Sequence, residues 1–232
     1  MLARAMLRLA DWLAPARCSA RWIVGGGLCL AVAGCGTSLD NPLSRRTNWF
    51  AFVGGTDLQA TCQPGQPDRI RLVYNGTWRG MQRIIAITGG RHPVLEEKTL
   101  GGMTVSRFSL GEAGEWWRGV DQSRPLTAQH YNDIRTALAQ DHLTTPPSRS
   151  VRLDSDEYYW TGAACLDGRF TLTAWRYPDQ AFQTLHFPTV IDLILPPAQP
   201  TPPPEPPNLA EFDRNARERW TLEIGPNGLV RP

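Results

Sequence analysis

Three carboxylates stand close together in the second half of the chain: Asp154, Asp156 and Glu157. In an extended segment Asp154 and Asp156 would share a face, because alternate side chains of a strand point the same way. Two carboxylic acids at a suitable separation can act as the acid and base of glycoside hydrolysis. The segment lacks the spacing of a calcium-binding loop. We therefore take these residues as candidate catalytic groups, with a solvated turn as the alternative.

Aromatic residues supply a second kind of candidate. Trp116 and Trp117 lie in a loop-like stretch, and Tyr158 opens a run of three aromatics. Their flat faces could stack on a sugar or a peptide. Neighbouring side chains of a strand point to opposite faces, so only part of each group can line one surface. These three residues are candidate ligand contacts, with core packing as the alternative.

The histidines follow no known catalytic or metal-binding pattern. His92, His130, His142 and His186 show neither H-x-x-x-H nor H-E-x-x-H spacing, which a zinc protease would require. A Gly-x-Ser-x-Gly motif is absent, and the glycine pairs do not open a helix as a phosphate-binding loop does. We therefore expect no cofactor and no metal site, and favour a non-enzymatic role.

The first 34 residues have the layout of a secretory signal. Four arginines and one aspartate precede residues 22–34, which form an uncharged run of 13 residues. A transmembrane helix needs about 20 apolar residues, so this run is too short to span a bilayer. A basic region followed by a short apolar run and small residues is typical of a signal peptide that is removed.

The end of this signal resembles the lipobox of bacterial lipoproteins. Val32-Ala33-Gly34-Cys35 has an aliphatic residue and two small residues before a cysteine. The resemblance implies cleavage before Cys35, lipid on that thiol, and an amide-linked acyl chain such as palmitate on the new N-terminus. Two or more acyl chains anchor a protein stably in a bilayer. Gly36 stands where an aspartate would imply retention in the inner membrane, so the resemblance favours the outer membrane.

Cleavage leaves 198 residues, enough for one domain with a sizeable core. The full chain has a formal net charge of +2. Subtracting the +3 of residues 1–34 leaves −1 for the mature part, which gives no reason to expect nucleic-acid binding.

Of the five cysteines, only Cys62 and Cys165 accompany Cys35 in the mature chain. In an oxidising compartment we expect these two to form a disulfide.

Hairpins account for most of the expected strands. Residues 69–74 alternate apolar and basic side chains as a half-buried strand does, and Asn75-Gly76 is a strong turn signal before a return strand over 77–88. Two further hairpins turn at Gly101-Gly102 and Asp167-Gly168. Their strands would cover 94–100 with 103–110, and 157–165 with 170–177. Apolar runs at 49–53 and 182–187 fit additional strands.

One principal helix is expected over residues about 127–141. Thr127 can cap its start, and apolar residues follow at helical spacing. Residues 189–195 fit either a short helix or a buried strand. Strands without helices between most of them predict an α+β fold with a mainly antiparallel sheet.

The mature chain divides by composition. Residues 35–47 are expected to be a flexible tether, 48–195 the α+β domain, and 196–207 a linker with eight prolines. Such a linker favours the extended polyproline conformation. Residues 208–232 would be an extension that docks on the domain, with a helix over 211–219 and a hairpin from 220 to 230.

The first functional hypothesis is a lipid-anchored component of the cell envelope on the periplasmic side. It would bind or support an envelope partner without being an enzyme, and the bilayer itself would be contacted through Cys35. The alternatives are a hydrolase of envelope polymers that uses the three carboxylates, and a module that binds glycan or peptidoglycan through the aromatic residues.

Overall fold

The computed structural model describes residues 49–77, 80–100, 120–201, 203–205 and 220–231. All of them belong to one compact unit of the chain, residues 38–232. The strands of the main sheet are β1 (Arg69–Gly76), β2 (Met81–Thr88), β3 (Val94–Leu100), β4 (Val120–Pro125), β6 (Tyr158–Leu166) and β7 (Arg169–Arg176). Those of a smaller sheet are β5 (Val151–Asp154), β8 (Thr221–Gly225) and β9 (Gly228–Arg231). The helices are α2 (Thr56–Ala60), α3 (Ala128–Gln140), α4 (Gln180–Gln183) and α5 (Phe187–Ile194).

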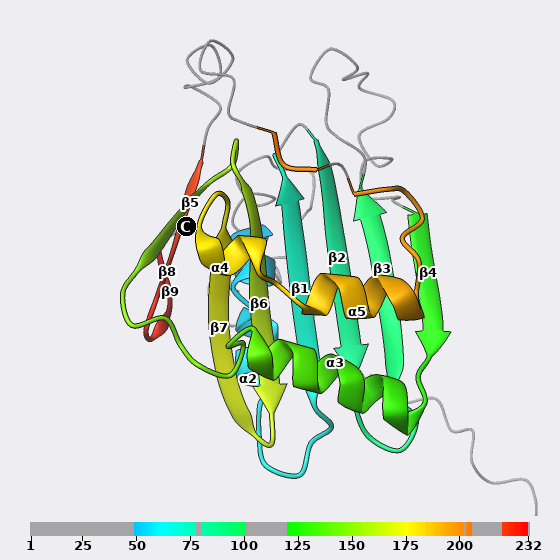
Figure 1. Ribbon diagram of the computed structural model, residues 1–232. Helices are drawn as coiled ribbons and strands as arrows, with labels where there is room; N and C mark the ends of the chain where they lie inside the picture. Colours follow the sequence, from blue (N-terminus) through cyan, green and yellow to red (C-terminus); the bar gives the residue numbers. More distant parts are fainter. Residues whose placement is uncertain (1–48, 78–79, 101–119, 202, 206–219, 232) are drawn as a thin grey trace, which may run out of the picture. The chain divides into compact units, whose positions relative to one another are not determined.

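Within the described residues, the main sheet has the order β4-β3-β2-β1-β6-β7 and the smaller one β5-β8-β9 (Figure 1). Every strand pair is antiparallel. The fold class is therefore α+β with a mainly antiparallel sheet, as the sequence predicts. β1 lies between β2 and β6, so the first and third expected hairpins join in the middle of the sheet.

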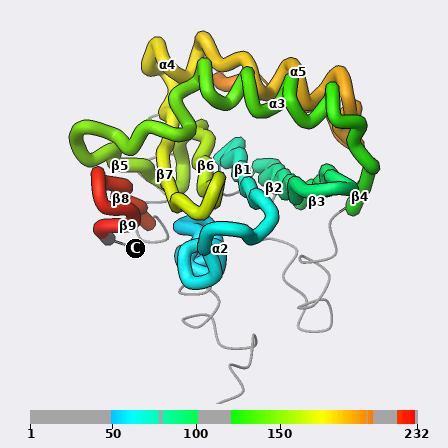
Figure 2. The backbone as a smooth tube through the Cα atoms, turned by 90° about the horizontal axis from the view of Figure 1, so that it is seen from below, coloured from blue at the N-terminus to red at the C-terminus, as the bar shows by residue number. Residues whose placement is uncertain are grey.

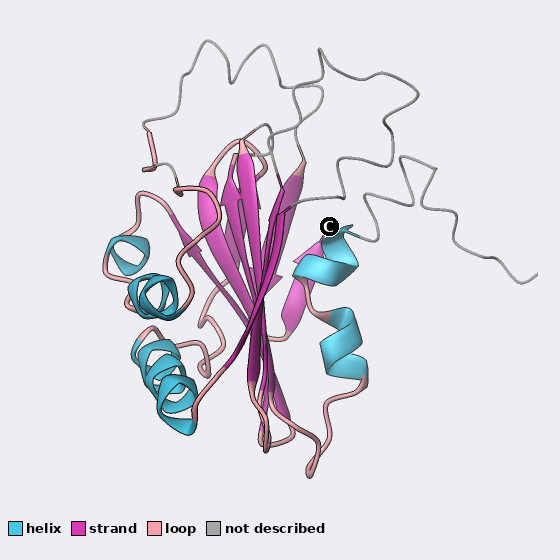
Figure 3. Cartoon of the chain, turned by 90° about the vertical axis from the view of Figure 1, so that its right-hand side faces the viewer, coloured by secondary structure: helices cyan, strands magenta, loops and turns pink. Residues whose placement is uncertain are grey.

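Helices cover both faces of the main sheet. Helices α3 and α5 lie side by side on one face, and residues 49–60 lie on the other (Figures 2 and 3). The first core fills the space beneath α3 and α5 and includes Leu72, Ile85 and Phe187. The second core joins the opposite face to residues 49–58 and the smaller sheet, and includes Phe50 and Leu222. Neighbouring side chains of a strand point to opposite faces, so Leu72 of β1 enters the first core and Val73 enters the second.

Helix α3 begins where the sequence places it. The hydroxyl of Thr127 accepts a hydrogen bond from the backbone N–H of His130 at 3.1 Å, which satisfies one of the free donors at a helix start. Ile134, Ala137 and Leu138 are buried beneath it. These positions follow the 3.6-residue period of a helix, so one face of α3 packs on the sheet.

A buried ionic group ties α5 to the sheet. The guanidinium of Arg83 in β2 lies 2.8 Å from the carboxylate of Glu97 and 2.6 Å from that of Asp192 in α5. The side chains of Arg83 and Glu97 are 1% and 0% exposed. A buried charge without a partner is costly, so each of these groups depends on the other.

Three local predictions were wrong. Residues 49–53 are helical, because Phe50 and Val53, three positions apart, both enter the second core. Asn75 and Gly76 continue β1 and pair with Gln82 and Met81. The side-chain amide of Asn75 donates to the backbone carbonyls of Ser155 and Glu157. These bonds hold Asn75 in the strand, so the turn to β2 comes after Gly76.

The third error concerns residues 182–187, which form no strand: they lie at the end of α4 and the start of α5. Strands β4 and β5 were not expected. The C-terminal hairpin is present as β8 and β9, and β8 pairs with β5 of the smaller sheet. The strand expected over 103–110, the turn at Gly101-Gly102 and the helix expected over 211–219 lie outside the described residues.

Candidate functional site

The three candidate carboxylates lie at the turn between β5 and β6. The carboxylate of Asp154 accepts a hydrogen bond from the hydroxyl of Thr221 at 2.7 Å. That of Glu157 accepts from the backbone N–H of Asp154 at 3.3 Å. Burial raises the pKa of Glu157 above its usual value, and the nearby charge of Asp154 adds to this effect. The hydrogen bond from the backbone N–H of Asp154 acts in the opposite direction and lowers the pKa. Asp154 and Glu157 therefore help to hold the turn and β8, while Asp156 lies between them.

Of the aromatic candidates, the structure describes Tyr158 alone. Trp116 and Trp117 lie outside the described residues. Tyr158 is partly buried and packs edge to face on Tyr177, with ring centroids 6.3 Å apart. Its neighbour Tyr159 points to the opposite face of β6 and is 1% exposed. Tyr158 thus contributes mainly to packing at the edge of the first core.

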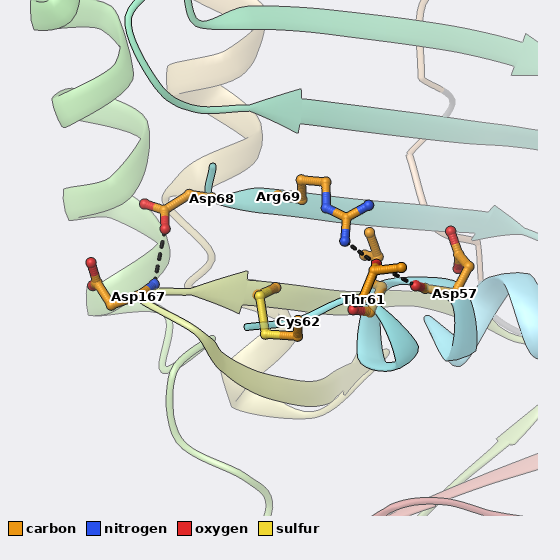
Figure 4. The surroundings of a disulfide bond; sticks show 8 residues. Asp57, Thr61, Cys62, Asp68, Arg69 and Asp167 are labelled. Atoms are coloured by element: carbon orange, nitrogen blue, oxygen red, sulfur yellow. Dashed lines mark hydrogen bonds between the residues drawn. A yellow bond between two sulfur atoms is a disulfide. The ribbon is translucent and has the colours of Figure 1, made fainter. Parts of the chain in front are cut away.

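The structure contains the expected disulfide between Cys62 and Cys165 (Figure 4). It joins the segment after α2 to β6, with the two Cα atoms 5.5 Å apart. Close by, the carboxylate of Asp68 accepts hydrogen bonds from the backbone N–H of Asp167 and the hydroxyl of Tyr131, each at 2.9 Å. These contacts link α3, the start of β1 and the β6–β7 turn on one side of the disulfide.

A buried carboxylate and an exposed imidazole meet where α3 ends and α5 begins. The side chain of Asp141 is 3% exposed, and that of His186 is 58% exposed. The carboxylate of Asp141 lies 2.8 Å from Nδ1 of His186. It also accepts hydrogen bonds from the backbone N–H groups of His186 at 2.9 Å and of Phe187 at 2.8 Å. This one side chain therefore caps α5 and orients the imidazole.

The backbone around Asp141 is held as firmly as its side chain. The indole N–H of Trp175 in β7 donates to the carbonyl of Asp141 at 2.9 Å. Trp175 and Phe187 pack together in the first core, with ring centroids 5.3 Å apart. The carboxylate that orients His186 is thus anchored to the sheet as well as to both helices.

His186 stands at one end of a groove of about 510 Å³ between α3 and α5. Asp133, Thr136 and Gln140 line the α3 side, and Thr189 lines the α5 side. The apolar residues of the lining are Ala137, Leu185 and Val190. A few hydrogen-bonding side chains around an apolar floor are typical of small-molecule sites.

Among the described residues, no group of three or more His, Cys, Asp and Glu side chains is arranged to hold a metal ion. In the same part of the chain, every helix is too short or too polar to cross a bilayer.

Comparison with protein-family models, curated proteins and solved structures found no match for the chain.

The pairing of Asp141 with His186 escaped the sequence analysis. The two residues are 45 positions apart. The known histidine motifs, such as H-x-x-x-H, have short spacings along the chain and do not include such a pair. Asp141 is the last residue of the expected helix, where an aspartate has no obvious role as a cap of its own helix. Only the packing of α5 against α3 brings the two side chains together.

Proposed function

We propose that the mature protein, residues 35–232, is a lipoprotein of the cell envelope that binds or supports a partner without being an enzyme. Acyl chains on Cys35 would hold it on the periplasmic face of the outer membrane. The observation that carries this proposal is the lipobox at 32–35 followed by the Cys62–Cys165 disulfide. Structural disulfides belong to oxidising compartments such as the periplasm, which is where a lipidated Cys35 would place this domain.

The bonding of the carboxylates favours a binding role over hydrolysis. Asp154 accepts from Thr221 and Glu157 accepts from the backbone of the same turn, so both contribute to local structure. The groove between α3 and α5 instead offers exposed hydrogen-bonding groups that face solvent. A glycan-binding module is therefore the second candidate, and this groove supports it.

Incorporation of labelled palmitate and membrane fractionation test the anchor. The parent protein should be labelled and should sediment with outer membranes, whereas Cys35→Ser should be unlabelled and uncleaved. Cys29→Ser, which alters a cysteine inside the apolar run, is the matched control and should behave as the parent does. Gly36→Asp should move the protein to the inner membrane. Labelling of Cys35→Ser would contradict the proposal.

A further inference from the structure

His186 is an exposed hydrogen-bonding group whose orientation is fixed before any ligand arrives. Its Nδ1 and its own backbone N–H both contact the carboxylate of Asp141. A carboxylate accepts hydrogen bonds, so the neutral imidazole carries its proton on Nδ1. Nε2, on the opposite edge of the ring, is then the acceptor, and little side-chain freedom is lost when a ligand binds there.

Capping of α5 explains only part of this arrangement. The backbone N–H groups of His186 and Phe187 satisfy the start of the helix through Asp141. The third bond, to the imidazole, is not required by the cap. Its effect is to hold an exposed ring in one orientation at the end of a groove, as residues around a binding site orient the groups that touch ligand.

The groove offers further hydrogen-bonding groups beside His186. Thr136 and Gln140 are four positions apart on α3, so they lie on the same side of that helix. Thr189 presents a hydroxyl from α5. Hydroxyl and amide groups can both donate and accept, which matches the mixed groups of a sugar. The lining also includes the partly buried apolar side chains of Leu185 and Val190.

The charge of the groove excludes several ligand classes. Among the described residues that line it, Asp133 is the one carboxylate, none is Lys or Arg, and the imidazole of His186 is the one aromatic ring. An anionic ligand would therefore meet repulsion without a compensating cation. A planar aromatic ligand would find only the small imidazole ring of His186 to stack on.

We propose that the groove between α3 and α5 binds a neutral saccharide that carries hydroxyl and N-acetyl groups, with Nε2 of His186 as a central acceptor. The hydroxyl groups would bond His186, Gln140 and the threonines, and the acetyl methyl would rest on Leu185 and Val190. This inference rests on the proposed binding function and names its ligand class and its site.

Saturation-transfer NMR with the mature protein, purified from membranes in detergent, tests the site. Triacetylchitotriose is the probe, with inorganic phosphate and trialanine as comparisons. We expect the saccharide to bind with a Kd on the order of 1 mM and the other two probes not to bind. His186→Ala should weaken binding at least tenfold, and Thr189→Val should weaken it several-fold.

His92→Ala is the matched control, because His92 is exposed in the β2–β3 turn and does not line the groove. It should bind as the parent protein does. Thermal unfolding of each variant separates loss of contact from loss of fold. Absence of saccharide binding, or equal binding by His186→Ala, would overturn the assignment, as would binding of trialanine or phosphate in its place. If the protein is lipidated but does not bind the saccharide, the proposed anchor at Cys35 stands and only the assignment of the groove is rejected.

Discussion

Glu157 is a half-buried carboxyl whose protonation should affect stability. Burial raises its pKa above the usual value of 4.5 in the folded protein, so folding favours the protonated form. The stabilising effect is complete below the unfolded pKa and is lost as pH rises through the folded pKa. At pH 7 the ionised group therefore costs stability.

Glu157→Gln should stabilise the protein at pH 7, by no more than about 1 kcal/mol because the group is partly exposed and screened. The gain should disappear below pH 4.5. Urea unfolding of both proteins between pH 4 and pH 8 measures the difference. A gain that is constant with pH would show that ionisation of Glu157 is not its source.

Asp141 should be important for stability as well as for the orientation of His186. Asp141→Ala would leave the part-buried N–H of His186, the buried N–H of Phe187 and the imidazole without their acceptor. Loss of hydrogen bonds to a charged group should cost about 2–3 kcal/mol. Asp133→Ala is the control, because Asp133 is exposed on α3 and bonds Gln129. It should change the free energy of unfolding by less than about 0.5 kcal/mol. Equal effects of the two substitutions would contradict this role for Asp141.

Among the elements, β2 holds a buried arginine that pairs with β3 through Glu97 and with α5 through Asp192. Arg83→Met would leave Glu97 buried without its cation, and such a change should cost about 3–5 kcal/mol. In Arg83→Met/Glu97→Leu the buried pair is gone and only Asp192, whose side chain is 38% exposed, is left without Arg83, so a large part of the loss should be regained. Chemical denaturation of Arg83→Met, Glu97→Leu and the double variant checks this. A double variant as unstable as the sum of the single changes would rule out the coupling.

The sequence predicted elements correctly where the residues that determine them are close together in the chain. Helix α3 follows from Thr127 and the apolar period after it, and the β6–β7 hairpin follows from Asp167-Gly168 between alternating strands. The failures have long-range causes. Residues 182–187 contain apolar side chains that suit a strand, but the carboxylate of Asp141 caps a helix there from 45 positions away.

The candidate site was missed for the same reason. The sequence drew attention to Asp154, Asp156 and Glu157 because they are neighbours in the chain. Asp154 and Glu157 prove to be bonded within a turn and to the adjacent strand. His186 gains its partner only through the contact of α5 with α3, which no short spacing in the sequence reveals. The Cys62–Cys165 pairing could be anticipated because these are the only two cysteines that follow Cys35 in the sequence.

At the scale of the whole molecule, the disulfide closes a long loop. Its cysteines are 103 positions apart, so Cys62→Ala/Cys165→Ala should cost about 2–5 kcal/mol of unfolding free energy. Urea denaturation with and without reductant measures the effect. Reductant should lower the stability of the parent toward that of the variant and leave the variant unchanged. A parent protein insensitive to complete reduction would contradict this contribution.

The most direct test of the central claim is the intact mass of the protein purified from its native membrane, with and without reduction. We expect the mass of residues 35–232 plus a diacylglycerol and an amide-linked acyl chain. Reduction should add two hydrogens, from opening of the Cys62–Cys165 bond. An unlipidated mass, or a chain that still carries residues 1–34, would contradict an anchor at Cys35 and the envelope function built upon it.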